Sequence, residues 1–294
     1  MNKNIYSEDH FVINFDNCYF ENVKSFGELG FGNVIVNNSY FTKFSSLSDK
    51  NYAILYSSSY GNKIKFFNST FENIKINYDK PLFHVFRTSL DSEFNDISTL
   101  IYGEYNKLDI INSKFHNLIS RSSIPLILDS IYSDIYITNT EFYNITGLVN
   151  EESNYYFKGV KFYEIESNSK SMIPVTYNNI SFDNCQFTNI LCNGDMDDSS
   201  LIKFQSSVYG NTFEISNSDI SNCISNGDLI KFDGSKSSVT LSNFDVQLNN
   251  VIVNENENVN KFKCGIINNS NNVKMSINNS EFKKNSVKNN GGVL

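Results

Sequence analysis

The chain has 294 residues, a formal net charge of −8 and a pI of about 5.0, and 40% of its residues are hydrophobic, which is enough for a substantial core. Its two arginines and the absence of any basic tract exclude a nucleic-acid partner, because phosphate binding needs clustered Lys and Arg. No apolar run approaches the roughly 20 residues of a membrane span, and five scattered cysteines without a CxxC pair predict neither a disulfide framework nor a zinc site.

A four-residue motif recurs through the whole chain. It consists of Asn, a small residue, a variable residue and Phe, as in NCYF at 17–20 and NSTF at 68–71. With the Phe position as anchor, the anchors are Phe20, Phe41, Phe71, Phe94, Phe115, Phe142, Phe162, Phe187, Ile220, Val246 and Phe282. Successive anchors lie between 20 and 36 residues apart, within the range of solenoid repeats. The unequal spacing predicts one recurring unit with inserted loops of different lengths.

The residues before each anchor predict two short strands joined by a one-residue bend. Positions seven and five residues before the anchor are mostly apolar and alternate with polar residues, which is the period of a half-buried strand. The alternation breaks three residues before the anchor, where residue types that tolerate left-handed backbone occur. We predict that the bend asparagines stack and hydrogen-bond from coil to coil as a ladder of Asn17, Asn38, Asn68, Asn112, Asn139, Asn184, Asn217, Asn243 and Asn279.

A further apolar strand precedes most units, as in YAILY at 52–56 and LIKF at 201–204 and 229–232. Three short strands per repeat and no helical pattern predict an all-β fold, a right-handed parallel β-helix solenoid of about 11 coils with loops of unequal length. Residues 1–294 are predicted to form a single β-helix domain. One coil fits poorly, because Arg87 and Ser89 fall in the inward columns before Phe94. We interpret this as a bulge or slipped register, with a buried functional Arg as the alternative.

The pattern of a strand, then NSxF or NCxF, then Asn resembles the repeats of polymorphic outer-membrane-type β-helices. It is also similar to Asn-rich surface β-helix proteins of anaerobic fungi, within the pectin-lyase-like fold. The last residues, NNGGVL at 289–294, look like the glycine-containing element that opens a coil in those families, so we expect the chain to be a segment of a longer repeat protein. Because pectin-lyase-like folds include polysaccharide lyases and glycoside hydrolases, the resemblance also implies a carbohydrate-active enzyme as an alternative function.

The densest acidic cluster is NGDMDDSS, with Asp195, Asp197 and Asp198. Such oxygens could hold calcium, and no other cofactor is expected. The cluster falls in a loop without an accompanying Arg or His, however, and NGD recurs at 226–228, which is more typical of a turn signal than of a site.

An aromatic column is the second candidate site. His116 follows the anchor Phe115 directly and is predicted to point outward, and its column continues with Tyr143 and Tyr163 in the next two coils. These three residues could form an exposed strip that stacks on sugar rings and binds carbohydrate. Ordinary pairing between adjacent strands is the alternative interpretation.

The catalytically unremarkable outer columns favour a non-catalytic rod at the cell surface or outside the cell, acting as a structural spacer, adhesin or interaction module. Its expected partners are carbohydrate or other surface proteins, with no nucleic acid and no membrane span within this chain. The N-terminal MNKNIYSEDHF lacks the apolar core of a signal peptide, while sequons at Asn37, Asn68, Asn144, Asn179, Asn268 and Asn278 favour secretion of a glycoprotein. A polysaccharide lyase or glycoside hydrolase and a glycan-binding module remain the alternatives.

Overall fold

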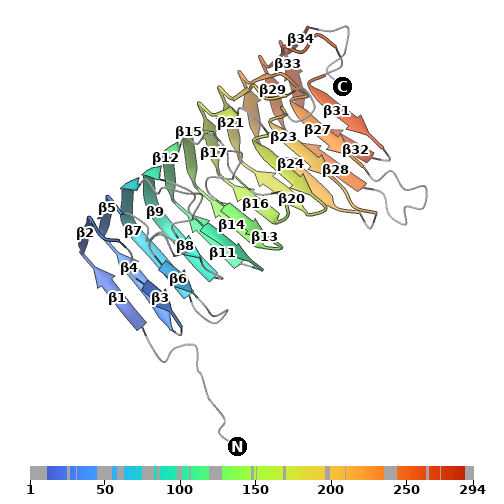
Figure 1. Cartoon of the computed structure of the whole chain (residues 1–294). Helices are drawn as coiled ribbons and strands as arrows, with labels where there is room; N and C mark the ends of the chain where they lie inside the picture. The colour runs from blue at the N-terminus through green and yellow to red at the C-terminus, as the bar shows by residue number, and fades with distance from the viewer. Residues whose placement is uncertain are drawn as a thin grey trace, which may run out of the picture.

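The computed structural model describes residues 12–24, 27–30, 32–44, 55–57, 63–74, 83–84, 87–97, 101–105, 107–118, 128–146, 149, 151–167, 170–195, 199–208, 210–234, 244–262, 265–271 and 273–288. Among these residues every strand pairing is parallel and joins one coil to the next, and no helix occurs. The fold is therefore an all-β parallel solenoid, as the repeat predicts (Figure 1).

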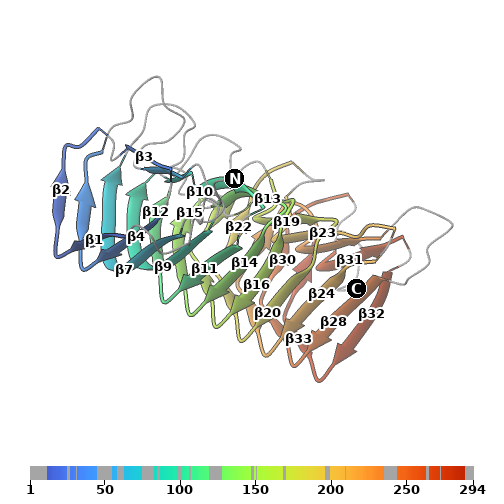
Figure 2. The ribbon, with the colours of Figure 1, turned by 90° about the horizontal axis from the view of Figure 1, so that it is seen from below.

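Four ladders of stacked strands make up the solenoid. The first ladder contributes one strand per coil and lies toward the viewer in Figure 2. Its strands are β1 (Val12–Asp16), β4 (Asn33–Asn37), the first half of β7 (Lys63–Ile74), the first half of β9 (Arg87–Ile97), β11 (Lys107–Ile111), β14 (Asp134–Thr138), β16 (Asn154–Lys158), β20 (Ile180–Asp183), β24 (Thr212–Ser216), β28 (Phe244–Asn249) and β32 (Val273–Asn278). These eleven strands correspond to the eleven predicted coils in the described part of the chain.

The second ladder follows the first in every coil and carries the anchors. Its strands are β2 (Tyr19–Glu21), β5 (Tyr40–Thr42), the second halves of β7 and β9, β12 (Lys114–Leu118), β15 (Glu141–Ile145), β17 (Lys161–Tyr163), β21 (Gln186–Thr188), β25 (Asp219–Ser221), β29 (Ile252–Asn254) and β33 (Glu281–Lys283). One residue at positive φ separates the two ladders in most coils, and we call this position the first bend.

The third ladder consists of two blocks. The N-terminal block contains β3 (Gly27–Leu29), β6 (Leu55–Ser57), β8 (Phe83–His84), β10 (Ile101–Glu104) and β13 (Leu128–Ile131), and the C-terminal block contains β19 (Ile173–Thr176), β23 (Ile202–Gln205), β27 (Ile230–Asp233) and β31 (Ile267–Ser270). A short fourth ladder, which the sequence pattern does not predict, consists of β18 (Glu166–Ser167), β22 (Leu191–Cys192), β26 (Ile224–Ser225), β30 (Glu257–Asn258) and β34 (Ser286–Val287).

The anchor side chains form the centre of the core. Phe rings from Phe20 to Phe187 stack coil upon coil, with centroids between 4.5 and 5.2 Å apart. Ile220, Val253 and Phe282 continue the same register. Because parallel coils repeat at about 4.8 Å, identical residues at one position fall at the separation that aromatic pairs prefer. This packing gives the motif its sequence period.

One predicted anchor is wrong. Val246 pairs in register with Phe213 and Met275, which places it seven residues before the anchor, and Val253 occupies the anchor position instead. The first bend of this coil is Asn250, at φ 56°, while the predicted bend, Asn243, lies outside the described residues. The error arises because this coil alternates apolar residues both before Val246 and before Val253, so two registers seven residues apart satisfy the pattern.

The interpretation of the coil before Phe94 as a slipped register is confirmed. Strand β9 runs through the first bend without the extra residue, so the register between β7 and β9 shifts between Phe67 and Ser69. As a result Leu90 pairs with Phe66 and Ile110, while Arg87 pairs with Lys107. The assignment of Arg87 and Ser89 to the inward columns is therefore wrong by one position.

The solenoid is a straight rod whose two ends carry the first and last coils (Figure 1). Ten spacings of about 4.8 Å between its eleven coils give a length on the order of 50 Å. At the C-terminal end the inward residues Met275, Ile277 and Phe282 are only partly buried, because the described chain places no coil above them.

Candidate functional site

The first bends form an axial ladder of side-chain hydrogen bonds. Asn17, Asn38, Asn68, Asn112, Asn139, Asn184, Asn217, Asn250 and Asn279 all have φ between 45° and 56°. Asn68 Nδ2 donates to Asn38 Oδ1 at 2.7 Å, and Asn250 Nδ2 donates to Asn217 Oδ1 at 3.0 Å. Asn suits this position because its short polar side chain lowers the cost of left-handed backbone and its amide joins neighbouring coils.

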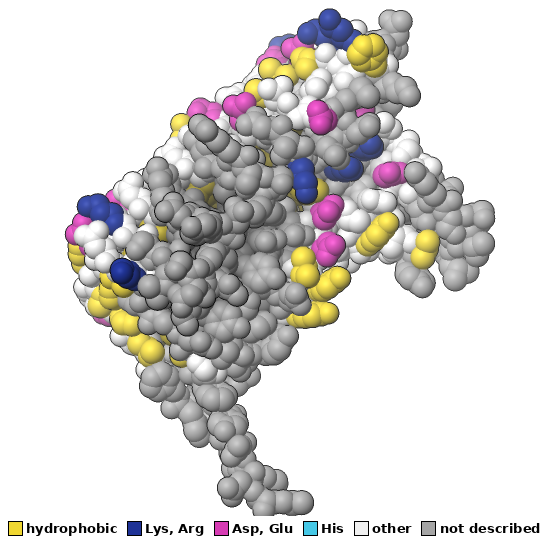
Figure 3. Space-filling model, viewed as in Figure 1, with side chains coloured by type: hydrophobic (Ala, Val, Ile, Leu, Met, Phe, Trp, Pro, Cys, Tyr) yellow, Lys and Arg dark blue, Asp and Glu magenta, His cyan; other side chains and the backbone are white. Residues whose placement is uncertain are grey.

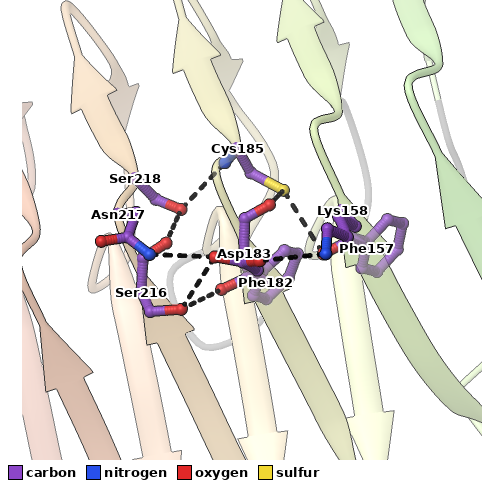
Figure 4. A network of polar contacts seen from close by, with 8 residues as sticks. All are labelled: Phe157, Lys158, Phe182, Asp183, Cys185, Ser216, Asn217 and Ser218. Atoms are coloured by element: carbon purple, nitrogen blue, oxygen red, sulfur yellow. Dashed lines mark hydrogen bonds and ion pairs between the residues drawn. The ribbon is translucent and has the colours of Figure 1, made fainter.

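Acidic side chains also take part in this ladder, and their charges are paired there. Asp183 Oδ1 accepts hydrogen bonds from Asn217 Nδ2 at 3.0 Å and from Ser216 Oγ at 3.3 Å (Figure 4). Lys158 Nζ of the preceding coil lies 3.8 Å from Asp183 Oδ2. The carboxylate therefore connects three successive coils, and its hydrogen bonds and ion pair run along the axis of the rod.

The second bend lies two residues after each anchor, and it was not predicted. It is Asn in six coils, at Asn22, Asn73, Asn117, Asn144, Asn189 and Asn222, and Lys43, Glu164, Glu255 and Lys284 occupy it in four others, all at positive φ. Asn144 Nδ2 donates to Asn117 Oδ1 at 2.9 Å. Charged members instead form ion pairs between coils, Lys43 with Glu21 at 2.7 Å and Lys284 with Glu255 at 2.6 Å. The signal was present in the sequence, since Asn recurs two residues after the anchor.

A buried column of hydroxyl groups accompanies the first bend on its inner side. Ser69 N–H donates to Ser92 Oγ at 3.2 Å, and Ser92 N–H donates to Ser113 Oγ at 3.1 Å. Several of these hydroxyls also donate to a carbonyl oxygen two residues earlier in their own coil, as Ser113 Oγ does to the Ile111 oxygen at 3.1 Å. The small residue of the motif thus satisfies a backbone N–H that the tight bend leaves without a strand partner.

The structure brings the predicted aromatic column together. His116, Tyr143 and Tyr163 pair in register; the Tyr143 and Tyr163 rings stack at 5.0 Å, and His116 meets Tyr143 edge to face at 5.9 Å. All three are partly buried. A hydrogen bond to Glu164 raises the pKa of Tyr143. The rings of this column are therefore less accessible than fully exposed ones, and carbohydrate binding by His116, Tyr143 and Tyr163 stays a prediction.

Three exposed tyrosines at the corner between the third and first ladders were not predicted. Tyr105, Tyr132 and Tyr177 have φ of 53°, 53° and 58°, and their exposed fractions are 61%, 56% and 57%. We call this position the third bend. Each lies ten residues before an anchor, so alignment on the anchors could have identified the column from the sequence.

Left-handed backbone is costly for a bulky residue, on the order of 1–3 kcal/mol each. The rings of Tyr105 and Tyr132 stack at 5.3 Å, which returns about 0.5–1.5 kcal/mol for the pair. The Tyr177 hydroxyl accepts an exposed hydrogen bond from Gln205 Nε2 at 3.3 Å. The third bend also carries Asn271, at φ 54° directly after β31, so the described contacts do not explain why three other coils carry Tyr at this corner.

A second aromatic pair, of which Tyr136 is exposed and Tyr156 partly buried, lies on the first ladder near the same corner. The rings of Tyr136 and Tyr156 stack at 4.7 Å, and Lys107 Nζ lies 5.6 Å from the centroid of the Tyr136 ring. Burial and the nearby Asp134 carboxylate raise the pKa of Tyr156. Figure 3 shows a group of hydrophobic side chains at the edge of the solenoid about midway along its length. The coils of β11 and β14 thus carry three exposed tyrosines, Tyr105, Tyr132 and Tyr136.

The acidic cluster receives little structural description. Asp195 is exposed, whereas Asp197 and Asp198 lie outside the described residues. Within the residues that the structure describes, no group of three or more His, Cys, Asp or Glu side chains is arranged to hold a metal ion. The suggested calcium site at Asp195, Asp197 and Asp198 therefore stays a prediction.

Of the cysteines that the structure describes, Cys185, Cys192 and Cys223 are buried in the core. Burial raises the pKa of the Cys185 thiol to about 11 and that of the Cys223 thiol to about 12, and it raises the pKa of Cys192 further still. These thiols pack as small apolar side chains, and Cys185 occupies the same column as the serine hydroxyls. They are unsuited to nucleophilic chemistry, because the thiolate is the reactive form.

Comparisons with known proteins add little to this geometry. No protein-family model matches the chain, and the search of curated proteins found no match. Two solved structures are similar to it, the A-modules of the mannuronan C-5 epimerases AlgE6 and AlgE4 from Azotobacter vinelandii. Each has 11% identity, with TM-scores of 0.27 and 0.21; the first match covers 89% of this chain and 90% of that chain, the second 90% and 91%. Likeness at this level supports no statement about activity, and the fold assignment depends on the strand pairing itself.

In the described ranges, the structure contains no helix long and apolar enough to cross a membrane.

Proposed function

We propose that this chain is a non-catalytic rod of an extracellular or cell-surface protein, which acts as a structural spacer and presents its outer columns to partners. The observation that carries the proposal is the direction of the polar side-chain contacts. At both the first and second bends, amides and charged groups hydrogen-bond from coil to coil along the axis. Side chains used in this way stiffen the rod and are not free to converge on a substrate.

A direct test of the spacer is its rigidity. Spin labels at Lys65→Cys and Gln247→Cys, in a background where Cys18 and Cys264 are replaced by Ser, report the distance between two exposed positions in one column of the first ladder. Seven coil spacings separate them, so we expect a single narrow distribution centred near ~34 Å. A broad distribution, or one much shorter than this, would contradict the spacer.

A carbohydrate-active enzyme remains the rival function, and the test is turnover. The protein is incubated with polygalacturonate, alginate and neutral polysaccharides, and the products are analysed for new reducing ends, unsaturated sugars and epimerised residues. We expect no turnover. Activity that disappears on replacing Asp195, Asp197 and Asp198 by Ala would establish the enzyme and overturn the non-catalytic proposal.

Placement outside the cell is a separate part of the proposal and has its own test. Sequons at six asparagines support it, although Asn68, Asn144, Asn268 and Asn278 use Nδ2, the atom that carries a glycan, in hydrogen bonds to other side chains. Antibody labelling of intact source cells is expected to detect the protein on the surface. Labelling that requires permeabilised cells would place the rod inside.

A further inference from the structure

The third bend offers an exposed row of aromatic rings that the core does not use. Tyr105 and Tyr132 occupy adjacent coils, and Tyr177 lies two coils beyond Tyr132. This order follows from the backbone, because Tyr132 N–H donates to the Glu152 oxygen at 2.7 Å and Thr176 N–H donates to the Glu151 oxygen at 2.8 Å. The row therefore runs parallel to the axis, along the edge that follows β10, β13 and β19 (Figure 1).

From this row we propose that the third bend is a binding site for a neutral polysaccharide chain, lying along the rod on Tyr105, Tyr132 and Tyr177. The first reason is conformational. Tyrosine at positive φ is unfavourable, yet it recurs three times at this corner, although Asn271, at φ 54° directly after β31, shows that the corner also accepts Asn. Backbone strain of this kind is tolerated where a side chain is needed for another purpose.

The second reason is exposure. The rings at the third bend are more than half exposed, whereas His116, Tyr143 and Tyr163 on the second ladder are partly buried. Tyr105 and Tyr132 cover only one face of each other, and the coil that follows Tyr132 carries Glu152 instead of a third ring. Among the described residues, Tyr132 therefore has a stacked ring on the side of Tyr105 and Glu152 on the other side.

The third reason is spacing. Coils repeat at about 4.8 Å, which is close to the advance of one hexose unit in an extended polysaccharide. Because the Tyr105 and Tyr132 rings stack on each other, a chain that lies parallel to the axis would meet their edges and hydroxyl groups, one coil spacing apart. Amide and hydroxyl groups beside the row, such as Gln205 and the hydroxyl of Tyr177, are suited to hydrogen bonds with sugar hydroxyls.

Charge selects among polysaccharides. Asp134, Glu151 and Glu152 are exposed at this corner, and Lys107, which pairs in register with Asp134, is an exposed cation next to them. A polyuronate would bring one carboxylate per sugar against these three acids, which costs electrostatic energy. The site therefore favours an uncharged chain, unlike the acidic polymers that pectin-type enzymes act on.

The test is isothermal titration of the whole chain with cellohexaose, mannohexaose and hexagalacturonate. We expect at least one neutral hexasaccharide to bind and hexagalacturonate not to bind. Tyr132→Asn is expected to weaken the affinity roughly tenfold or more while leaving the urea midpoint unchanged or higher, because Asn accepts positive φ. The matched control is Tyr19→Asn, which removes a tyrosine that is 64% exposed on the regular strand β2 and is expected to leave binding unchanged.

The inference rests on the proposed function in one respect, because it assumes that the ligand is bound without being converted. The outcomes of the titration test the two separately. Failure of both neutral hexasaccharides to bind, equal binding of hexagalacturonate, or full binding by Tyr132→Asn would each overturn it. If Tyr132→Asn does not fold, Tyr132→Gly also accepts positive φ and replaces it in the same titration. A hexasaccharide that binds and is recovered cleaved would overturn the non-catalytic rod and leave the binding site standing.

Discussion

At the residue scale, the bend asparagines combine two tasks that few other side chains can perform together. Asn tolerates φ near 50° better than other residues with a Cβ, and its amide both donates and accepts. The donor of one coil therefore meets the acceptor of the coil before it, as Asn68 and Asn38 show. The abundance of Asn in this sequence is a consequence of repeating this corner in coil after coil.

Replacing Asn68 by Ala tests this account. Ala loses the hydrogen bond to Asn38 Oδ1 and keeps a Cβ at φ 45°, so we expect the free energy of unfolding to fall by about 1–3 kcal/mol, measured by urea denaturation. Asn68→Gly should cost less, because Gly adopts this backbone freely. Asn14→Ala is the control, since Asn14 is an exposed residue within strand β1, and an equal loss there would refute the role of the bend.

The buried thiols give a pH prediction. In the folded protein the raised pKa values of Cys185, about 11, and Cys223, about 12, keep both thiols protonated at pH 8. A variant in which Cys18 and Cys264 are replaced by Ser should therefore react with a thiol reagent only after unfolding. Because the unfolded thiols ionise near the ordinary pKa of 9.0, the unfolded state binds fewer protons above that pH, and stability should fall as the pH rises from about 9 toward 12. Rapid labelling of the native variant at pH 8 would show that the core is open.

At the element scale, each coil supplies atoms that complete its neighbour. The hydroxyl of Ser113 accepts the Ser92 N–H of the preceding coil and is only 1% exposed. Strand pairing alone would leave that N–H buried without a partner, because the bend interrupts the ladder. The small residue of the motif is therefore a hydrogen-bonding group as well as a space filler, which the sequence pattern by itself did not reveal.

Ser113→Ala separates these two properties. The methyl group fits the space, but the Ser92 N–H loses its acceptor, so the unfolding free energy should fall by about 1–3 kcal/mol in urea or thermal denaturation. Ser113→Cys should cost less, since Cys18 and Cys185 already occupy this column. If Ser113→Ala were as stable as Ser113→Cys, side-chain size alone would determine which residues this column accepts.

At the scale of the whole molecule, the solenoid is a sum of coils that each contact mainly the next. Ile180 and Phe213 pair at the same position of successive coils. Deleting residues 180–212 therefore joins Asn179 to Phe213 with the strand register intact. The first ladder then passes from β16 directly to β24.

We expect this deletion variant to fold cooperatively and to be shorter by one coil, about 4.8 Å. The distance between spin labels at Lys65→Cys and Gln247→Cys measures the change. A deletion of 180–195, which removes only part of a coil, is the control and is expected to abolish cooperative unfolding. An equally stable product from both deletions would show that coil register does not determine the fold.

The sequence by itself determined the architecture, because a solenoid must repeat the same residue types wherever coils stack. The anchor column of Phe and the bend column of Asn predicted the parallel β-helix and eleven coils before any contact was known. The positive φ of Asn17 and Asn279, at opposite ends of the rod, follows from the same column.

Only the tertiary structure decided register and exposure. Two stretches of one coil satisfy the pattern equally well, and strand pairing selected Asn250 over Asn243 as the bend. The missing residue in β9 became visible only when Leu90 paired with Phe66. The tyrosines of the third bend carry no sequence mark that separates a packed ring from an exposed one. Their left-handed backbone and exposure arise where the third ladder meets the first, and it is this corner, outside the repeating motif, that we propose binds a ligand.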